Sequence, residues 1–101
     1  MQNHKVHSPL YIGFDFNYEK INKLKEEADC FLIDDFNTKI LSPARLNLSI
    51  EIVYHAHARE KRLFITTNEK ELSVPEPVLS RILEMCKVVK IEGGDLRVKF
   101  K

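Results

Sequence analysis

Short apolar segments alternate with amphipathic segments along this chain. Residues 10–16 place apolar side chains at every second position, which predicts an edge strand buried on one face. The unbroken apolar run Cys30–Ile33 predicts a central parallel strand that is covered on both faces. Leu63–Thr67 predicts a third strand that ends in polar residues, and the apolar residues of segment 88–91 predict a fourth.

Three helices are predicted between these strands. Asn17 can cap a first helix that ends near Asp29. The pair Ser42-Pro43 supplies an N-cap and a proline at the first helical position for a second helix, which runs to about Lys61. A third helix follows Pro77, where apolar residues recur at helical spacing.

This alternation of strands and helices predicts an α/β fold. Right-handed crossovers would give a three-layer domain, with a mostly parallel sheet of about four strands and helices on both faces. Glu92–Asp95 can turn the last strand into a C-terminal β-hairpin with Leu96–Phe100. We expect residues 1–8 to be a flexible lead-in and residues 9–101 to form one domain.

Length and composition restrict the chain to one small core. The 101 residues are 44% hydrophobic, and a formal net charge of +1 argues neither for a nucleic-acid coat nor for an acidic tail. No apolar run approaches the roughly 18 residues that a membrane span needs, so we expect a cytoplasmic protein without membrane contact. Cys30 and Cys86 each lie in an apolar stretch, which favours buried thiols over a disulfide.

Two adjacent acidic residues follow the predicted central strand. Asp34 and Asp35 would lie at the carboxyl end of that strand, where ligands bind in parallel sheets, and the end of the strand before Asn68 should lie beside them. We expect both aspartates to lie within reach of Asn68 itself, because the two strands end on the same side of the sheet. Such a pair can serve a hydrated Mg²⁺ and polarise an attacking water in nucleotide hydrolysis. It can equally begin a loop and cap backbone amides, and these two residues alone favour neither interpretation.

Four motifs, read in order, resemble those of one group of ATPases. They are a Walker B strand, a sensor 1 strand, a helix with an arginine finger and a closing segment, matched by Cys30–Phe36, Leu63–Asn68, Ser80–Cys86 and Ile91–Arg97. Over most of its length the chain therefore resembles the bacterial helicase-loader and transposon-helper AAA+ ATPases, the DnaC/IstB group related to the DnaA initiator.

The resemblance implies nucleotide chemistry for the polar residues at the strand ends. Asp34 would be the acid associated with Mg²⁺, and Asp35 would align with the catalytic acid. Asn68, or less readily Thr67, would be the sensor at the γ-phosphate of ATP.

Two arginines also match the family. Arg81, in the third helix, would reach the nucleotide of a neighbouring subunit as an arginine finger. Arg97 matches a family arginine after the last strand and is a candidate cofactor-binding residue.

The chain departs from the family at the phosphate loop. No segment reads G-x-x-x-x-G-K-[ST], the loop whose amides and lysine hold phosphates, and the family's first strand, phosphate loop and first helix would precede Leu10. We therefore expect this chain alone neither to bind ATP and Mg²⁺ tightly nor to hydrolyse ATP.

An adaptor or regulator of DNA replication is the function that this combination favours. It would act through contacts with a replication initiator or a helicase-type protein, with weak or indirect DNA contact. Two alternatives stay open. In the first, the chain would be a portion of an ATPase whose phosphate loop comes from a separate or missing segment. In the second, it would be a structural or interaction domain with degenerate motifs.

The missing first strand predicts a defect in the sheet. The family's strand order resembles 5-1-4-3-2, so without strand 1 one edge of the strand at Leu63–Thr67 is exposed. An exposed parallel edge invites pairing. Either the segment 87–100 moves into the vacancy, or two chains pair there as a homodimer.

Histidines and a basic cluster offer weaker candidates. His55 and His57 are two residues apart on a predicted helix, which favours packing or solvent-facing roles over a metal pair. Arg59, Lys61 and Arg62 are better explained as cations at the end of a helix than as contacts to a phosphate backbone.

Overall fold

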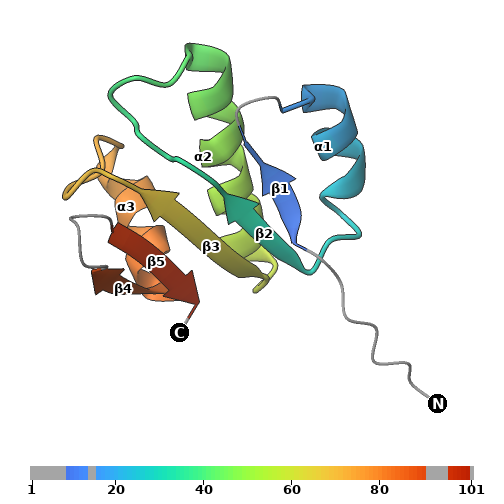
Figure 1. Ribbon diagram of the computed structural model, residues 1–101. Helices are drawn as coiled ribbons and strands as arrows, with labels where there is room; N and C mark the ends of the chain where they lie inside the picture. Colours follow the sequence, from blue (N-terminus) through green and yellow to red (C-terminus); the bar gives the residue numbers. More distant parts are fainter. Residues whose placement is uncertain (1–8, 14–15, 91–95, 101) are drawn as a thin grey trace.

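One sheet of five strands carries three helices in the part of the chain that the structure describes (Figure 1). The computed structural model describes residues 9–13, 16–90 and 96–100, with residues 88–90 and 96–100 described by their backbone only. The elements in chain order are β1 (Leu10–Ile12), α1 (Tyr18–Leu24), β2 (Cys30–Ile33), α2 (Pro43–Ala58), β3 (Arg62–Thr67), α3 (Glu76–Met85), β4 (Cys86–Lys90) and β5 (Leu96–Phe100).

The first three strands form the parallel part of the sheet. The strand order is β1-β2-β3-β5-β4, and β1, β2 and β3 pair in parallel, with Ile12 opposite Ile33 and Ile33 opposite Ile65. β5 runs antiparallel to both of its neighbours. The predicted α/β fold with a mostly parallel core is confirmed, and β1 lies at the edge as its alternating pattern predicted.

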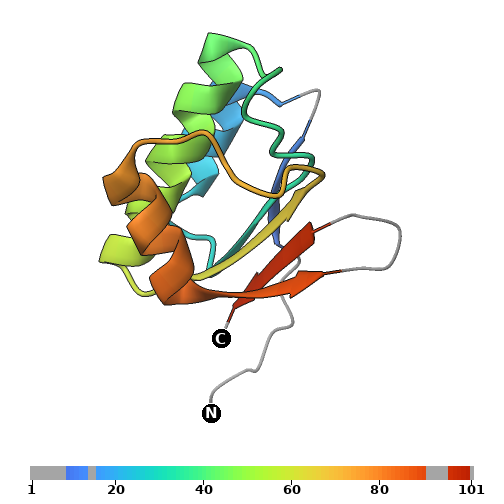
Figure 2. The same cartoon turned by 90° about the vertical axis from the view of Figure 1, so that its left-hand side faces the viewer.

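The three helices lie side by side on one face of the sheet (Figure 2). This placement differs from the expected cover on both faces. Each right-handed crossover moves the chain one way along the sheet, from β1 to β2, from β2 to β3 and from β3 past β5 to β4. Because all three steps have the same direction, all three helices are brought to the same side.

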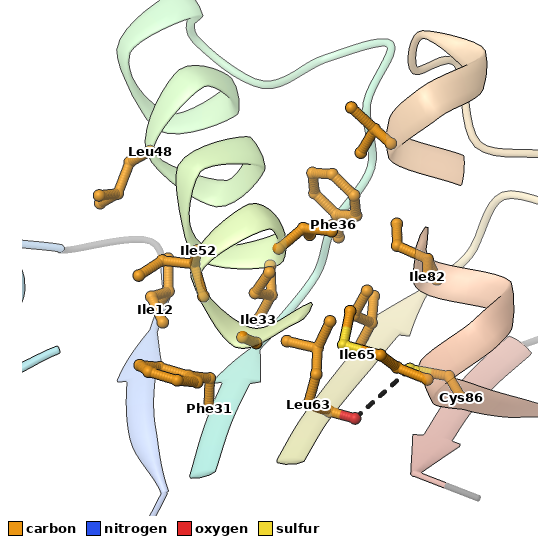
Figure 3. Packing of buried hydrophobic residues seen from close by; sticks show 14 of the residues in the cluster. Ile12, Phe31, Ile33, Phe36, Leu48, Ile52, Leu63, Ile65, Ile82 and Cys86 are labelled. Atoms are coloured by element: carbon orange, nitrogen blue, oxygen red, sulfur yellow. Dashed lines mark hydrogen bonds between the residues drawn. The ribbon is translucent and has the colours of Figure 1, made fainter. Parts of the chain in front are cut away.

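A single core fills the space between this face and the helices (Figure 3). Phe31, Ile33 and Leu63 point from the strands into it and are fully buried, and Ile52 of α2 meets them. The thiol of Cys86 is buried in the same layer and donates to the carbonyl oxygen of Leu63 over 3.5 Å. Both cysteines are free thiols, as their apolar surroundings predicted, although Cys30 is only half-buried.

Side-chain caps fix the starts of two helices. The Asn17 side chain accepts a hydrogen bond from the amide of Lys20, and the Ser42 hydroxyl accepts one from the amide of Arg45. Proline follows Ser42 at the first helical position, where its missing N–H is no loss. Both predicted helix starts are confirmed.

The end of α1 comes five residues earlier than predicted. The helix stops at Leu24, and the carbonyl oxygens of Lys25 and Glu26 bind the Lys61 ammonium group, each at 2.9 Å. His55 of α2 also contacts the Lys25 carbonyl, at 3.1 Å. These partners lie far away in the sequence, so the local pattern did not reveal where the helix ends.

The carboxyl-terminal strand fills the gap beside β3. β5 pairs with β3 through Ile65 and Val98, and it separates β3 from β4. Of the two predicted outcomes, the structure agrees with the first, since the terminal segment covers this edge of β3. The turn predicted at 92–95 and the lead-in predicted at 1–8 lie outside the described residues.

Candidate functional site

The two adjacent aspartates lie at the carboxyl edge of the parallel strands. Asp34 follows the last residue of β2, and its amide donates to the carbonyl oxygen of Ile12 in β1 over 3.0 Å. Because Ile33 pairs with Ile65, the next residues, Asp34 and Thr66, are also neighbours. The predicted meeting of the two strand ends at one edge is confirmed.

The Asp34 carboxylate joins the three parallel strands. Its Oδ2 accepts a hydrogen bond of 2.8 Å from the Tyr11 hydroxyl in β1, and its Oδ1 accepts one of 2.5 Å from the Thr66 hydroxyl in β3. The bond from Thr66, and next the bond from Tyr11, holds the pKa of Asp34 below its ordinary value. Asp34 is therefore a half-buried anion whose two oxygens both have partners in the neighbouring strands.

Asp35 turns the chain back towards β3. Its φ of 54° lies in the left-handed region, which Asp tolerates better than most residues, and its side chain is exposed. Its amide donates to the Thr66 hydroxyl over 2.8 Å, and the next amide, of Phe36, donates to the Thr66 carbonyl oxygen over 2.7 Å. Thr66 thus accepts hydrogen bonds from the amides of both Asp35 and Phe36 and fixes this turn.

A buried arginine holds the other side of the turn. Arg45, in the first turn of α2, is only 6% exposed, and its Nη2 donates to the Asp34 carbonyl oxygen. Its positive charge also contributes, as the last of several causes, to the lowered pKa of Asp34. The helix that follows the acidic pair therefore stabilises the conformation of that pair.

Gly13 makes room for the Tyr11 ring. A Cβ at Gly13 would lie 2.1 Å from Cε2 of Tyr11 and 2.5 Å from its hydroxyl oxygen. The tyrosine ring therefore crosses close to the backbone just beyond β1, on its way to Asp34. A side chain at position 13 would displace the hydroxyl that Asp34 accepts.

Thr67 and Asn68, the residues predicted as sensors, contact Asn37 and not Asp34. The Thr67 hydroxyl donates to Oδ1 of Asn37 over 3.1 Å, and the Asn68 amide donates to the same oxygen over 2.9 Å. Thr67 is buried, whereas the Asn68 side chain is exposed. The residue at the end of β3 that touches Asp34 is Thr66, one position before the predicted pair.

A second carboxylate joins the loops that follow β2 and β3. Glu69 accepts from the Thr38 hydroxyl over 2.5 Å and from the Lys39 amide over 2.9 Å, and the Thr38 oxygen in turn accepts from the Ser73 amide over 2.8 Å. Burial raises the pKa of Glu69, but these hydrogen bonds outweigh burial and bring it below its ordinary value. The two loops are thereby fixed to each other over the edge of the sheet.

The two predicted arginines lie in different surroundings. Arg81 of α3 donates to the Pro77 carbonyl oxygen over 2.9 Å, and its guanidinium carbon lies 4.7 Å from the centre of the Tyr54 ring in α2. It belongs to the helix layer and is not part of the Asp34 cluster. The backbone of Arg97 in β5 pairs with Thr66, next to that cluster, and its side chain lies outside the described structure.

The weaker candidates have structural roles. His57 contacts Glu84 of α3 at 2.7 Å, and Arg59 lies 3.6 Å from Glu26. His55 is buried, and its two ring nitrogens contact the Lys25 carbonyl oxygen and the Arg59 guanidinium group. The Lys61 ammonium group also lies 3.3 Å from Nε2, so cations flank the ring on both sides and favour its neutral form.

We expect His55 to make stability fall as the pH drops from 7.5 to 5.5. Burial, then the charges of Lys61 and Arg59, lower the pKa of His55 in the folded chain. The unfolded chain therefore binds a proton first, near pH 6.5, so the stabilisation is complete above that pH and is lost below it. Urea unfolding of the parent chain and His55→Gln checks this, since the variant should have a flatter pH profile.

Asn47→Gln is the control for that measurement, because Asn47 lies on the same helix, is exposed and does not titrate. Its pH profile should follow the parent chain. If His55→Gln and the parent chain lose stability in parallel, the buried imidazole is not the group that titrates.

Within the described residues, no group of three or more histidine, cysteine or acidic side chains is arranged to hold a metal ion. No described helix is long and apolar enough to cross a membrane.

No family model, curated protein or solved structure that was compared with this chain matches it. What the geometry defines is the class: a small α/β domain with a three-stranded parallel sheet and polar residues gathered at its carboxyl edge.

Sequence reasoning found the acidic pair and missed its partners. Tyr11, Thr66 and Arg45 come from three separate elements, and only the pairing of the strands brings them to Asp34. One signal was present: Asp34 and Thr66 each follow an apolar strand segment, which predicts a meeting at one edge. The cluster can hold a negative charge in a fixed position and can bind donors at the exposed Asp35.

Proposed function

We propose that this chain is a AAA+-like domain of the helicase-loader and initiator type that acts as an adaptor or regulator in DNA replication through protein contacts. The acidic pair after β2 and the polar end of β3 support the resemblance, because they meet at one edge in the order that the resemblance implies. Each Asp34 oxygen already accepts a hydroxyl group, however, so the hydrogen bonds to Tyr11 and Thr66 would compete with Mg²⁺-ATP for this carboxylate.

The observation that carries the proposal is the direction of β5. A phosphate loop leaves the carboxyl end of a parallel strand and leads into a helix. Beside β3, where the resemblance expects that strand, β5 is antiparallel and so has its amino end at this edge. That position therefore supplies no phosphate loop, which is why we propose an adaptor and not an ATPase.

We expect calorimetric titration with Mg²⁺-ATP to show no binding at concentrations up to about 1 mM, the weak end of the affinity scale. The phosphate-binding amides and lysine have no counterpart in the sequence, and Asp34 and Asp35 repel a polyphosphate. Micromolar affinity that is lost in Asp34→Ala would contradict the proposal.

A binding assay tests the adaptor role separately. The chain would be immobilised and exposed to the replication initiator and the replicative helicase of its source organism. Binding of either one supports the proposal. If neither protein binds, an interaction domain with degenerate motifs would be the better interpretation.

A second candidate function is one portion of an ATP-hydrolysing AAA+ protein. The position of Asp34 and Asp35 at the carboxyl edge favours it, because those acids would face a nucleotide supplied by a further segment. Reading the gene upstream for an open frame with G-x-x-x-x-G-K-[ST] tests it, and hydrolysis by the joined segments would favour it over the adaptor.

A further inference from the structure

One face of the sheet carries no helix in the described part of the chain, since α1, α2 and α3 all lie on the other face (Figure 2). We call it the open face. Tyr11, Leu32 and Phe64 pair in one row across β1, β2 and β3, on the side opposite to the buried Ile33 and Ile65. Tyr11 is 49% exposed, and Leu32 and Phe64 are half-buried.

The centre of the open face is apolar. Strands of parallel sheets are buried on both faces, usually under helices, and β2 has the continuous apolar sequence expected of such a strand. The row from Tyr11 to Phe64 spans two strand spacings, roughly 10 Å. That width matches the diameter of one α-helix with its side chains, about 10–12 Å.

The charged side chains that the strands themselves contribute are all basic, and Asp34, just beyond the carboxyl end of β2, is the acidic neighbour of this row. None of the five described strands contains an acidic residue, whereas Arg62 of β3, which pairs with Cys30, and Lys87 of β4 are exposed cations. Lys87 is exposed and follows the buried Cys86, so it lies on the open face, and its backbone pairs with that of Lys99. Asp34, at the carboxyl end, already accepts two hydroxyl groups.

These charges decide between occupants. A second copy of the chain stacked face to face would add further cations to the interface and no acidic strand residue to pair with them, which is unfavourable. An amphipathic helix with acidic residues beside its apolar stripe would cover the apolar row and meet the lysines and arginines.

We propose that the open face binds an acidic amphipathic helix of a partner protein. The apolar stripe of that helix lies over Tyr11, Leu32 and Phe64, and its acidic flank faces Lys87 and Arg62. The inference goes beyond the proposed function and does not rest on it, because the open face and its charges are the same whatever the carboxyl edge of the sheet does.

Two synthetic peptides test the proposal. Each has about 18 residues, long enough to hold a helix, and both share one leucine stripe that is flanked by glutamates in one peptide and by lysines in the other. Fluorescence anisotropy at low salt should show the glutamate peptide binding at least about tenfold more tightly than the lysine peptide. Added salt should reduce that difference.

Charge reversal on the chain supplies the matched variants. Lys87→Glu should weaken the glutamate peptide and strengthen the lysine peptide, whereas Lys20→Glu, an exposed position on α1 in the helix layer, should change neither. Cys30 shares the open face with Leu32, so the glutamate peptide should slow its alkylation, read by mass spectrometry against the buried Cys86. Both lysines are exposed, so the variants should remain folded.

Four results would overturn the proposal. The first is failure of both peptides to bind at about 1 mM, and the second is equal affinity of the chain for the two peptides. The third is protection of Cys30 from alkylation by a thymidine oligonucleotide but not by the glutamate peptide. The fourth is protection of Cys30 from alkylation that rises with protein concentration in the absence of any peptide. The third result would assign the open face to nucleic acid, and the fourth to a second copy of the chain.

Discussion

Replacing Phe36 by alanine should destabilise this domain more than any other single change considered for the site. The ring is fully buried, directly after the acidic pair, and its backbone amide donates to the Thr66 carbonyl oxygen. Truncation of such a ring costs about 3–5 kcal/mol. A domain of this size has about 5–15 kcal/mol of unfolding free energy, so much of the total should be lost.

Urea unfolding followed by circular dichroism checks this, with Ile40→Ala as the control. Ile40 lies in the same loop but is 79% exposed, and its truncation should change the free energy by less than about 0.5 kcal/mol. Nearly equal stabilities of the two variants would mean that Phe36 does not anchor the loop to the core.

The second large effect is expected for Thr66→Val. The substitution keeps the shape of the side chain but removes the hydroxyl that donates to Asp34 and accepts from the Asp35 amide. A hydrogen bond to a charged group contributes about 1.5–3 kcal/mol, so we expect a loss in that range at neutral pH. Water reaches this half-buried site and should keep the loss from exceeding it.

The pH dependence of Thr66→Val separates this mechanism from simple loss of packing. The pKa of Asp34 is lowered in the folded chain, so its contribution is present above the unfolded value of about 3.9 and is lost as the pH falls through the folded value. Because the Thr66 bond is the largest cause, the valine variant should lose less stability on acidification. The difference between the two chains should therefore be greatest near pH 7 and narrow below pH 4.

Thr66→Ser is the matched control, since it retains the hydroxyl and removes only a methyl group. It should keep the pH profile of the parent chain even if its stability is somewhat lower. A valine variant with an unchanged acid transition would show that Asp34 does not depend on Thr66.

The two aspartates that follow β2 differ in what they can do. The Asp34 carboxylate accepts hydrogen bonds from Tyr11 of β1 and Thr66 of β3, and the Asp34 amide donates to the Ile12 carbonyl oxygen. Asp35 is exposed, and only its backbone is held. The acidic pair, which suggests nucleotide chemistry, can therefore equally serve to hold the strands together. The Mg²⁺-ATP titration distinguishes these two roles.

The positions and types of the helices and strands could be predicted from the sequence because they depend on local patterns. The apolar run at Cys30–Ile33 and the caps at Asn17 and Ser42 lie within the segments that they define. The end of α1 could not be predicted in this way. It depends on Lys61 and His55, which reach the last carbonyl groups from 30 residues or more away.

The sequence by itself determined which residues end the parallel strands, and therefore that Asp34 and Asp35 lie at the same edge of the sheet as Thr66–Asn68. The tertiary structure decided which of them touch. Register places Thr66 rather than Asn68 against Asp34, and the approach of β1 adds Tyr11. It also decided that β5 pairs beside β3 and that the three described helices lie on one face. Strand order and the direction of each crossover are properties of the whole chain, which no local pattern encodes.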